Sequence, residues 1–209
     1  MNRSLQETFW AGAFGDQYIE RNNSQELVAS NIALFSKILQ HTSKIDSVCE
    51  LGANIGLNLV ALHSLLLDAE LTGVEINQKA ADRLSQLPYV NVKCCSIYDI
   101  CPPPADKKYD FVFTKGVLIH QNPELLPTAY DILYQNSRRY IMLCEYYNPT
   151  PVEVVYRGHT SVLYKRDFAG EIMMKYSDLL LLDYGFVYHR DNHFKGDDFT
   201  WFLMEKSQS

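Results

Sequence analysis

The chain has 209 residues, 47% of them hydrophobic, and a formal net charge of −6. This length and apolar content suit one folded domain with its own core. A net negative charge without a long basic run argues against nucleic acid or an anionic membrane as the partner, so a small molecule is expected. The N-terminal MNRSLQETFW is not an apolar signal region, and no run of about 18 apolar residues follows, so we expect a protein that is not exported and works in the cytoplasm.

Hydrophobic periodicity predicts helices and strands in alternation along the chain. We expect helices over 25–40, 56–67, 78–87 and 124–135, the first with Ser24 as its N-cap. We expect strands over 47–51, 70–75, 90–96, 109–114 and 139–145. Short apolar strands joined by helices are typical of a parallel sheet that is covered on both faces.

The end of the chain breaks this alternation. Two strand-like runs, 179–190 and 198–206, are separated only by DNHFKGD, which is too short for a helical crossover and predicts an antiparallel hairpin at one end of the sheet. The predicted fold is therefore α/β, a Rossmann-like, doubly wound sheet of seven strands, mostly parallel, with an antiparallel C-terminal hairpin strand. We expect a single domain made of an N-terminal helical arm, a core of strands and helices, an insertion and the hairpin. These parts cover 1–45, 46–146, 147–178 and 179–209, respectively.

The segment ELGANIG (50–56) joins the first predicted strand to the next helix. In this position, backbone N–H groups and a helix N-terminus face a ligand at the carboxyl edge of the sheet. Gly52 and Gly56 are expected to let a cofactor lie against the backbone, and Asn54 takes the place of a central glycine because asparagine tolerates a positive φ. Glu75 ends the second strand, where an acid accepts hydrogen bonds from ribose hydroxyls. Together these features favour a nucleotide site over the alternative, an ordinary turn beside a surface glutamate.

The glycine pattern distinguishes between nucleotides. A nicotinamide dinucleotide site has G-x-G-x-x-G, whereas here Asn54 and Leu57 stand where further glycines belong. Glu50 precedes the first glycine, and a carboxylate there favours a cationic ligand over a pyrophosphate. S-adenosylmethionine carries an amino group and a sulfonium and no phosphate, so it is the expected cofactor, with S-adenosylhomocysteine as its product.

These features, together with YDFVF in the fourth strand and the C-terminal hairpin, resemble a class I S-adenosylmethionine-dependent methyltransferase over nearly the whole chain. More narrowly, the sequence resembles the small methyltransferases associated with pseudaminic acid biosynthesis. The strings that carry this second resemblance are FWAGAFGDQYIERN, KGVLIHQNPELL, EYYNPTPVEVVYRGH, YKRDFAGE, LDYGF and DDFTWFLMEK, at 9–22, 115–126, 145–159, 164–171, 182–186 and 197–206. The link to a sugar substrate is implied by association with that pathway.

The resemblance implies cofactor contacts position by position. The methionine part would lie against the loop after the first strand, the ribose against the acid after the second, the adenine beside the residues after the third, and the sulfonium above the backbone that ends the fourth. An N-terminal segment would fold over the cofactor, with aromatic faces that suit a sulfonium; the alternative for these aromatic residues is packing of the arm. The implied cofactor-binding residues are Trp10, Tyr18, Arg21, Glu50, Gly52, Asn54, Gly56, Glu75, Ser96, Ile97 and Lys115.

Methyl transfer requires an aligned, desolvated acceptor, and a base only where the acceptor is a hydroxyl or a protonated amine. His120 follows the fourth strand at the carboxyl edge and is the candidate base; the alternative is that it caps the next helix or packs against the loop. Glu145 and Tyr146 end the fifth strand at the same edge and complete the candidate catalytic set.

The segment beyond the fifth strand is rich in polar and aromatic groups. Aromatic faces and planar polar groups suit a sugar, and arginines suit a carboxylate or a phosphate. The alternative is an insertion that packs on the sheet with surface ion pairs. The candidate substrate-binding residues are Tyr147, Asn148, Tyr156, Arg157, His159 and Arg166.

These residues favour an enzyme. The leading hypothesis is methyl transfer to a hydroxyl or amino group of a small polar acceptor, a sugar or sugar-nucleotide in nonulosonic (pseudaminic) acid or surface-glycan biosynthesis. One alternative is a cofactor-binding module without catalysis that regulates or scaffolds a glycan-assembly complex, and a less favoured one is a nicotinamide-dependent oxidoreductase. A catalytic metal is not expected, because His189 and His193 fall in a hairpin turn and no third ligand accompanies them.

Overall fold

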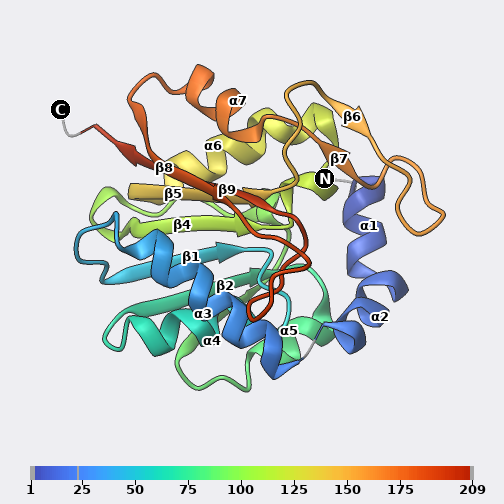
Figure 1. The fold of residues 1–209 in the computed structure, drawn as a ribbon, viewed down its shortest axis with the longest axis horizontal. Coiled ribbons are helices and arrows are strands. Elements are labelled where there is room, and N and C mark those ends of the chain that lie inside the picture. The colour runs from blue at the N-terminus through green and yellow to red at the C-terminus, as the bar shows by residue number, and fades with distance from the viewer. Residues whose placement is uncertain (1–2, 23, 208–209) are drawn as a thin grey trace.

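The computed structural model describes residues 3–22 and 24–207. Its main sheet has seven strands (Figure 1), in the order β3 (Val90–Cys94), β2 (Glu70–Glu75), β1 (Ser47–Leu51), β4 (Tyr109–Lys115), β5 (Ser137–Glu145), β9 (Thr200–Lys206) and β8 (Leu179–Phe186). Strands β1 to β5 are parallel, and β9 pairs antiparallel with both β5 and β8. The predicted mostly parallel, Rossmann-like sheet with an antiparallel C-terminal hairpin is therefore confirmed.

The hairpin of β8 and β9 has a longer connection than the sequence predicts. The prediction that the first of these strands covers 179–190 is wrong, because β8 ends at Phe186 and the chain then turns. The carboxylate of Asp191 accepts hydrogen bonds from the backbone N–H groups of His193 and Phe194, at 2.9 and 2.7 Å, which takes these groups out of any strand ladder. The other predicted elements lie within three residues of the observed bounds.

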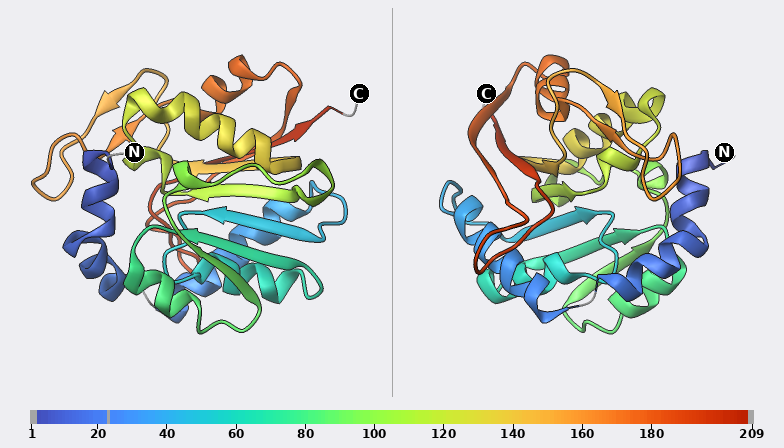
Figure 2. Two further views of the ribbon diagram at one scale, coloured as in Figure 1. Left: turned by 180° about the vertical axis from the view of Figure 1, so that it is seen from behind. Right: turned by 45° about the vertical axis from the view of Figure 1, so that its right-hand side comes forward.

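Helices cover both faces of the sheet. On one face are α3 (Gln25–Leu39), α4 (Leu57–Leu65) and α5 (Gln78–Leu84), and on the other are α6 (Leu126–Asn136) and α7 (Phe168–Lys175), as Figures 1 and 2 show. The predicted N-cap of α3 is present, since the Ser24 hydroxyl accepts a hydrogen bond from the backbone N–H of Leu27. No helix in the described part of the chain is long and apolar enough to span a membrane.

Two connections differ from a simple alternation of strand and helix. Between β3 and β4 the chain forms only short 3₁₀ turns, Ile97–Asp99 and Ala105–Lys107, and no α-helix. Between β5 and β8 it forms a small hairpin, β6 (Val152–Glu153) with β7 (Tyr164–Lys165), followed by α7. The segment expected as a substrate-loop insertion, 147–178, thus contains both this hairpin and a helix that packs on the sheet.

An N-terminal arm of two helices, α1 (Leu5–Ala11) and α2 (Ala13–Arg21), stands across the carboxyl ends of the parallel strands (Figure 1). Asn77, just after β2, anchors this arm to the sheet. Its side-chain amide donates to the carbonyl of Trp10 at 3.2 Å and to the carboxylate of Asp16 at 3.0 Å. The arm therefore closes a space over the edge of the sheet where ligands bind in this architecture.

Candidate functional site

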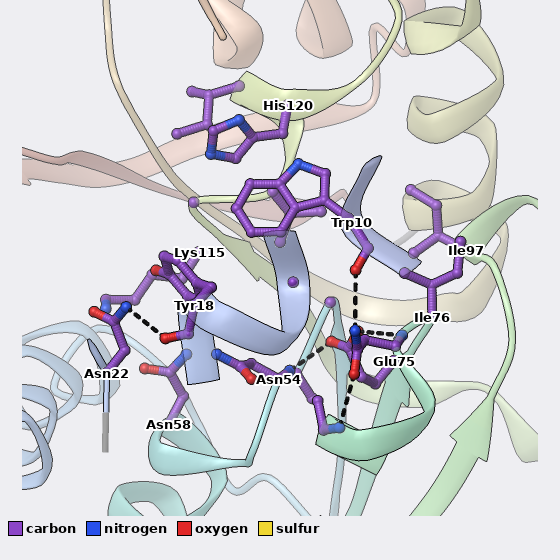
Figure 3. Close-up of a pocket in the computed structure, with 18 of the residues that line it drawn as sticks. Trp10, Tyr18, Asn22, Asn54, Asn58, Glu75, Ile76, Ile97, Lys115 and His120 are labelled. Atoms are coloured by element: carbon purple, nitrogen blue, oxygen red, sulfur yellow. Dashed lines mark hydrogen bonds between the residues drawn. The ribbon is translucent and has the colours of Figure 1, made fainter. Parts of the chain in front are cut away.

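A cavity of about 380 Å³ lies between the N-terminal arm and the carboxyl edge of the sheet (Figure 3). Small-molecule sites have volumes of roughly 300–1,000 Å³, so its size suits a ligand of that class. Its walls come from the arm, from the loops after β1 to β5 and from the loop before β9. The polar residues that line it include Gln6, Glu7, Asn22, Asn31, Asn54, Asn58, Glu75, Asn77, Ser96, Lys115, His120, Gln121, Arg157 and Asp197.

The loop after β1 is held against β2. The backbone N–H groups of Gly52 and Ala53 both donate to the carbonyl of Val74, at 2.8 and 2.9 Å. Asn54 has a φ of 49°, in the left-handed region that the sequence predicted for the place of the central glycine. Gly52 and Asn54 both line the cavity, so this loop presents backbone to a ligand.

Glu75 connects the loop after β1 to the loop after β2. One carboxylate oxygen accepts from the backbone N–H of Asn54 and the other from that of Asn77, both at 2.7 Å. Burial raises the pKa of this carboxyl, and the hydrogen bonds from the backbone N–H groups oppose that rise. Each carboxylate oxygen keeps further acceptor capacity, so Glu75 is placed to bind hydroxyl groups in the cavity that it lines.

Replacing Asn54 with glycine is expected to leave the free energy of unfolding unchanged or slightly higher. Glycine adopts a φ of 49° without strain, and the backbone N–H still donates to Glu75. Asn54→Val, the contrasting variant, is expected to lose about 1–2 kcal/mol, because a left-handed conformation is costly for a β-branched residue. Urea unfolding of the two variants measures the difference, and a glycine variant less stable than the valine variant would contradict this role of the backbone.

The N-terminal arm supplies aromatic walls. Trp10 and Tyr18 line the cavity with their ring centroids 5.3 Å apart, and the Trp10 ring lies 4.5 Å from the ring of His120. Arg21, predicted as a third contact from this arm, does not line the cavity. Its guanidinium lies 5.4 Å from the ring centroid of Phe14 and 6.0 Å from that of Tyr18, so it makes cation–π contacts within the arm itself.

The loops after β3 and β4 form the opposite wall. Ser96 and Ile97 line the cavity, and the Ser96 hydroxyl donates to the carboxylate of Glu7 at 2.6 Å, which attaches the arm at this end as well. Lys115, at the end of β4, also lines the cavity, and its ammonium lies 5.3 Å from the ring centroid of Phe199. These three predicted residues therefore share one space with Glu75 and Trp10.

Glu50, in β1, and Gly56, at the start of α4, do not line the cavity, although the sequence predicts both as cofactor-binding residues. Glu50 is buried behind it, and its carboxylate accepts from the side-chain amide of Asn58 at 2.6 Å, so Asn58 is the residue that lines the cavity. Gly56 faces the interior, because a β-carbon there would come within 2.4 Å of Leu84. A glycine is favoured there for two reasons: its φ of 86° lies in the left-handed region, and the missing side chain leaves room for α5 against this loop.

The burial of Glu50 predicts a pH-dependent stability. Burial raises the pKa of this carboxyl from 4.5 to about 8, so the folded state binds a proton more tightly than the unfolded state does. Its contribution to stability is therefore complete below the unfolded pKa and is lost as the pH rises through about 8. Glu50→Gln keeps an oxygen that accepts from Asn58 and removes this titration.

We expect the free energy of unfolding of Glu50→Gln to exceed that of the wild type by a margin that grows between about pH 5 and pH 8. Urea unfolding at a series of pH values measures the margin. A margin that is constant or shrinks over this range would show that Glu50 is ionised in the folded protein.

His120, the candidate base, lines the cavity but is held by the chain that leads into β7. Its Nδ1 lies 2.6 Å from the carbonyl oxygen of Val162, and because a carbonyl only accepts, Nδ1 carries the proton. Burial lowers the pKa of this imidazole from 6.5 to about 4, so His120 is neutral at physiological pH and Nε2 is a hydrogen-bond acceptor. The expected titration near neutral pH is thus not supported by its environment.

Of the two predicted catalytic residues at the end of β5, Glu145 and Tyr146, only Tyr146 lines the cavity. Glu145 does not line the cavity; its buried carboxylate accepts hydrogen bonds from the backbone N–H groups of Val117, Leu118 and Ile119, at 3.1 to 3.3 Å. These groups begin the 3₁₀ turn that carries His120, so Glu145 orders the loop after β4. Tyr146 does line the cavity.

The hairpin after β5 brings two predicted substrate-binding residues to the cavity, Tyr156 and Arg157. They lie on a tight turn in which Tyr156 and His159 exchange backbone hydrogen bonds of 2.9 Å. His159 does not line the cavity; it packs against the arm, with its ring centroid 5.0 Å from that of Phe9.

The other three predicted substrate-binding residues lie outside the cavity. Arg166 forms an ion pair with Glu171 of α7, with Nε and the carboxylate oxygen 2.8 Å apart. Asn148 donates from its backbone N–H to the carbonyl of Arg166 at 3.3 Å. Tyr147 is 43% exposed and lies against Phe202, with ring centroids 5.9 Å apart. These residues hold the insertion against the sheet, which is the alternative that the sequence analysis left open.

Several cavity residues were not predicted from the sequence. Asn58 lies on the first turn of α4 and Asn77 follows Glu75 by two residues, so their nearness to the loop motif was a usable signal. Gln6, Asn31 and similar residues come from distant segments, and no pattern in the chain marks them. The missed lining residues include Gln6, Glu7, Asn22, Asn31, Asn58, Asn77, Gln121, Asp197 and Phe199.

The strand order of the main sheet identifies the class of fold. The seven-stranded sheet, with β9 antiparallel between β5 and β8, is a fold that this chain shares with solved structures of S-adenosylmethionine-dependent methyltransferases. No family model matches the sequence, and no curated protein matches it.

Solved structures share this fold at low sequence identity. Magnesium protoporphyrin IX methyltransferase from Synechocystis with bound S-adenosylmethionine aligns with a TM-score of 0.64 at 15% identity, over 99% of this chain and 100% of that one. A Burkholderia thailandensis 1,6-didemethyltoxoflavin-N1-methyltransferase with S-adenosylhomocysteine aligns with a TM-score of 0.69 at 13% identity, over 98% and 88%. The plantazolicin methyltransferase BpumL with S-adenosylhomocysteine gives 0.65 at 14% identity, over 97% and 94%. The narrower resemblance to pseudaminic acid-associated methyltransferases is not shown by these comparisons.

Proposed function

We propose that this protein transfers a methyl group from S-adenosylmethionine to a hydroxyl or amino group of a small polar acceptor. The observation that carries the proposal is Glu75, which ends β2, is fixed by two backbone N–H groups and lines a cavity beside the Gly52–Asn54 backbone. This is the arrangement that binds the ribose of an adenosyl group in a doubly wound sheet. It is also consistent with the cofactors bound in the structural neighbours.

The residues present fit such a cofactor. The Asn58 amide oxygen and the Trp10 indole N–H are buried and have no hydrogen-bond partner among the described residues, and both residues line the cavity. An unpaired buried polar group is costly, which favours a polar ligand. Glu75 would hold the ribose, Ile97 would flank the adenine, and Gly52, Asn54 and Asn58 would face the methionine part.

The chain's own residues then position and shield the reacting groups. When bound, the cofactor supplies a methyl group on a positively charged sulfur. The aromatic faces of Trp10 and Tyr18 favour positive charge, and the arm that carries them excludes water from the cavity. His120 and Tyr146 line the same cavity and are placed to orient the acceptor by hydrogen bonds.

For the acceptor, we propose a sugar or sugar-nucleotide of nonulosonic acid or surface-glycan biosynthesis. The support is the set of strings that resemble pseudaminic acid-associated methyltransferases, and Tyr156 and Arg157, which line the cavity from the hairpin after β5. Arg157 forms no ion pair with the described residues, so its guanidinium is available to a carboxylate or a phosphate. We propose that this reaction takes place in the cytoplasm.

Calorimetric titration with S-adenosylhomocysteine, and in parallel with NAD, tests the proposal. We expect saturable binding and a raised melting temperature with S-adenosylhomocysteine and neither with NAD. Binding of NAD alone would instead support a nicotinamide-dependent oxidoreductase. Binding of S-adenosylhomocysteine without methyl transfer to any sugar-nucleotide acceptor would support the non-catalytic module.

A further inference from the structure

Two side chains in the cavity are oriented by consecutive residues of the segment before β7. The side-chain amide of Gln6 donates from Nε2 to the carbonyl of Ser161 at 2.8 Å, and His120 Nδ1 lies 2.6 Å from the carbonyl of Val162. A carbonyl oxygen only accepts hydrogen bonds, so each contact fixes an orientation. Gln6 turns its NH₂ group toward the chain, and His120 carries its proton on Nδ1.

The atoms left over are both hydrogen-bond acceptors. Gln6 Oε1 is buried and has no partner among the described residues. His120 Nε2, on the ring edge opposite Nδ1, makes no hydrogen bond with them either. Gln6 and His120 are each only 7% exposed, and both line the cavity. One buried acceptor and one acceptor at the cavity, each oriented by a hydrogen bond to a backbone carbonyl, favour a ligand group that brings two hydrogens.

The His120 ring lies on the far side of the Trp10 ring from Glu75. Gln6 and Trp10 are one turn apart on α1 and share a face of that helix. The Trp10 ring lies 4.5 Å from His120, whereas its backbone carbonyl accepts from Asn77 beside Glu75. Figure 3 shows the Trp10 ring between His120 and Glu75. The proposed ribose site and the His120 ring thus lie on different sides of the Trp10 ring.

We propose that Gln6 and His120 bind a primary amino group of the methyl acceptor, with its two N–H bonds directed to Gln6 Oε1 and His120 Nε2. The lone pair on nitrogen then remains free for the methyl group. A hydroxyl brings a single hydrogen and would leave one of the two acceptors unpaired. The inference rests on the proposed function and narrows it to N-methylation of an amino compound, such as an amino sugar.

The step is balanced without a further reactant. The nitrogen of the neutral amine forms a bond to the methyl carbon while the bond between that carbon and sulfur breaks, and the electron pair of the broken bond stays on sulfur. The product is a secondary ammonium, which releases one proton to water. Neither Gln6 nor His120 has to take up this proton, so the pair acts by orienting the amine.

A binding experiment separates this proposal from a role in holding the adenine amino group, which also carries two N–H bonds. The variants are Gln6→Met, which removes the acceptor oxygen, and His120→Asn, which removes the acceptor at the position of Nε2 and retains a donor for the Val162 carbonyl. Melting temperatures show whether each variant is folded, and titration with S-adenosylhomocysteine is done without an acceptor. We expect dissociation constants within about twofold of the wild type. A weakening of about tenfold or more in both variants would assign the pair to adenine and overturn the proposal.

A matched pair of acceptor probes tests the selectivity for nitrogen. UDP-glucosamine and UDP-glucose differ in an amino group against a hydroxyl, and release of S-adenosylhomocysteine measures methyl transfer to each. We expect release with UDP-glucosamine to be at least about tenfold faster. Equal release, or faster release with UDP-glucose, would overturn the inference.

Release with neither probe, in a protein that binds S-adenosylhomocysteine, would count against the catalytic part of the proposed function. The nitrogen-15 spectrum of His120 then decides the inference separately. We expect a neutral ring with the proton on Nδ1, and a shift of the Nε2 resonance when UDP-glucosamine is added to the complex with S-adenosylhomocysteine. A proton on Nε2, or no shift of that resonance, would overturn the proposed contact.

Discussion

Replacing Glu145 with alanine is expected to lower the free energy of unfolding by about 3 kcal/mol or more. The buried carboxylate accepts hydrogen bonds from the backbone N–H groups of Val117, Leu118 and Ile119, and each unpaired buried donor costs about 1–3 kcal/mol. Burial raises the pKa of Glu145 to about 7, while the N–H groups favour the charged form. Because its pKa is raised in the folded protein, Glu145 contributes most to stability below its unfolded pKa and less as the pH rises through about 7. The loss is therefore best measured by urea unfolding at about pH 5.

The matched control for this variant is Glu124→Ala. Glu124 follows the same loop but is exposed, and its side chain makes no hydrogen bond with the described residues. Its loss should change the free energy of unfolding by less than about 0.5 kcal/mol. Similar unfolding energies for the two variants would show that Glu145 does not order the loop after β4. Loss of methyl transfer with full stability in Glu145→Ala would instead restore the catalytic role that the sequence analysis assigned to it.

Replacing Glu75 with alanine is expected to weaken binding of S-adenosylhomocysteine by about 10- to 100-fold, which corresponds to roughly 1–3 kcal/mol for a charged hydrogen-bond acceptor. Two effects contribute to this loss. The carboxylate that would accept from the ribose hydroxyls is removed, and the backbone N–H of Asn54 loses the partner that holds the loop after β1. Calorimetric titration of the folded variant gives the dissociation constant.

Glu70→Ala is the control for this measurement, because Glu70 begins the same strand but is exposed at the opposite end from the cavity. It should bind S-adenosylhomocysteine as the wild type does. A second variant, Glu75→Gln, replaces one carboxylate oxygen by an NH₂ group that faces a backbone donor, so we expect it to bind more weakly than the wild type. Unchanged binding in Glu75→Ala would remove the observation on which the proposed function rests.

Much of the fold follows from local patterns in the sequence. Strands β1 and β2 have the predicted bounds, because runs such as SVCEL are short, apolar and followed by turn residues. Helix α3 begins where Ser24 marks its N-cap. The placement of Asn54 in a left-handed conformation was predictable as well, since it depends on the backbone preference of one residue in a glycine-rich loop.

The direction in which a side chain points was less predictable. Glu50 and Gly56 belong to the loop motif, yet one lies behind Asn58 and the other faces α5. Glu145 and His120 both lie at the edge of the sheet where ligands bind. Glu145, however, orders the loop after β4, and burial lowers the pKa of the His120 imidazole. In each case the packing of neighbouring elements decides the role, and a single sequence does not contain that information in readable form.

By itself, the sequence determined the alternation of strands and helices, the C-terminal hairpin, the loop after β1 and the acid after β2. These features depend on residues that are close together in the chain, and their period and turn chemistry are local properties. Only the tertiary structure decided which side chains share the cavity. Gln6 and His120 line the same cavity because the N-terminal arm and the segment before β7 pack over the same edge of the sheet. Contacts between such distant segments arise from the packing of the whole domain.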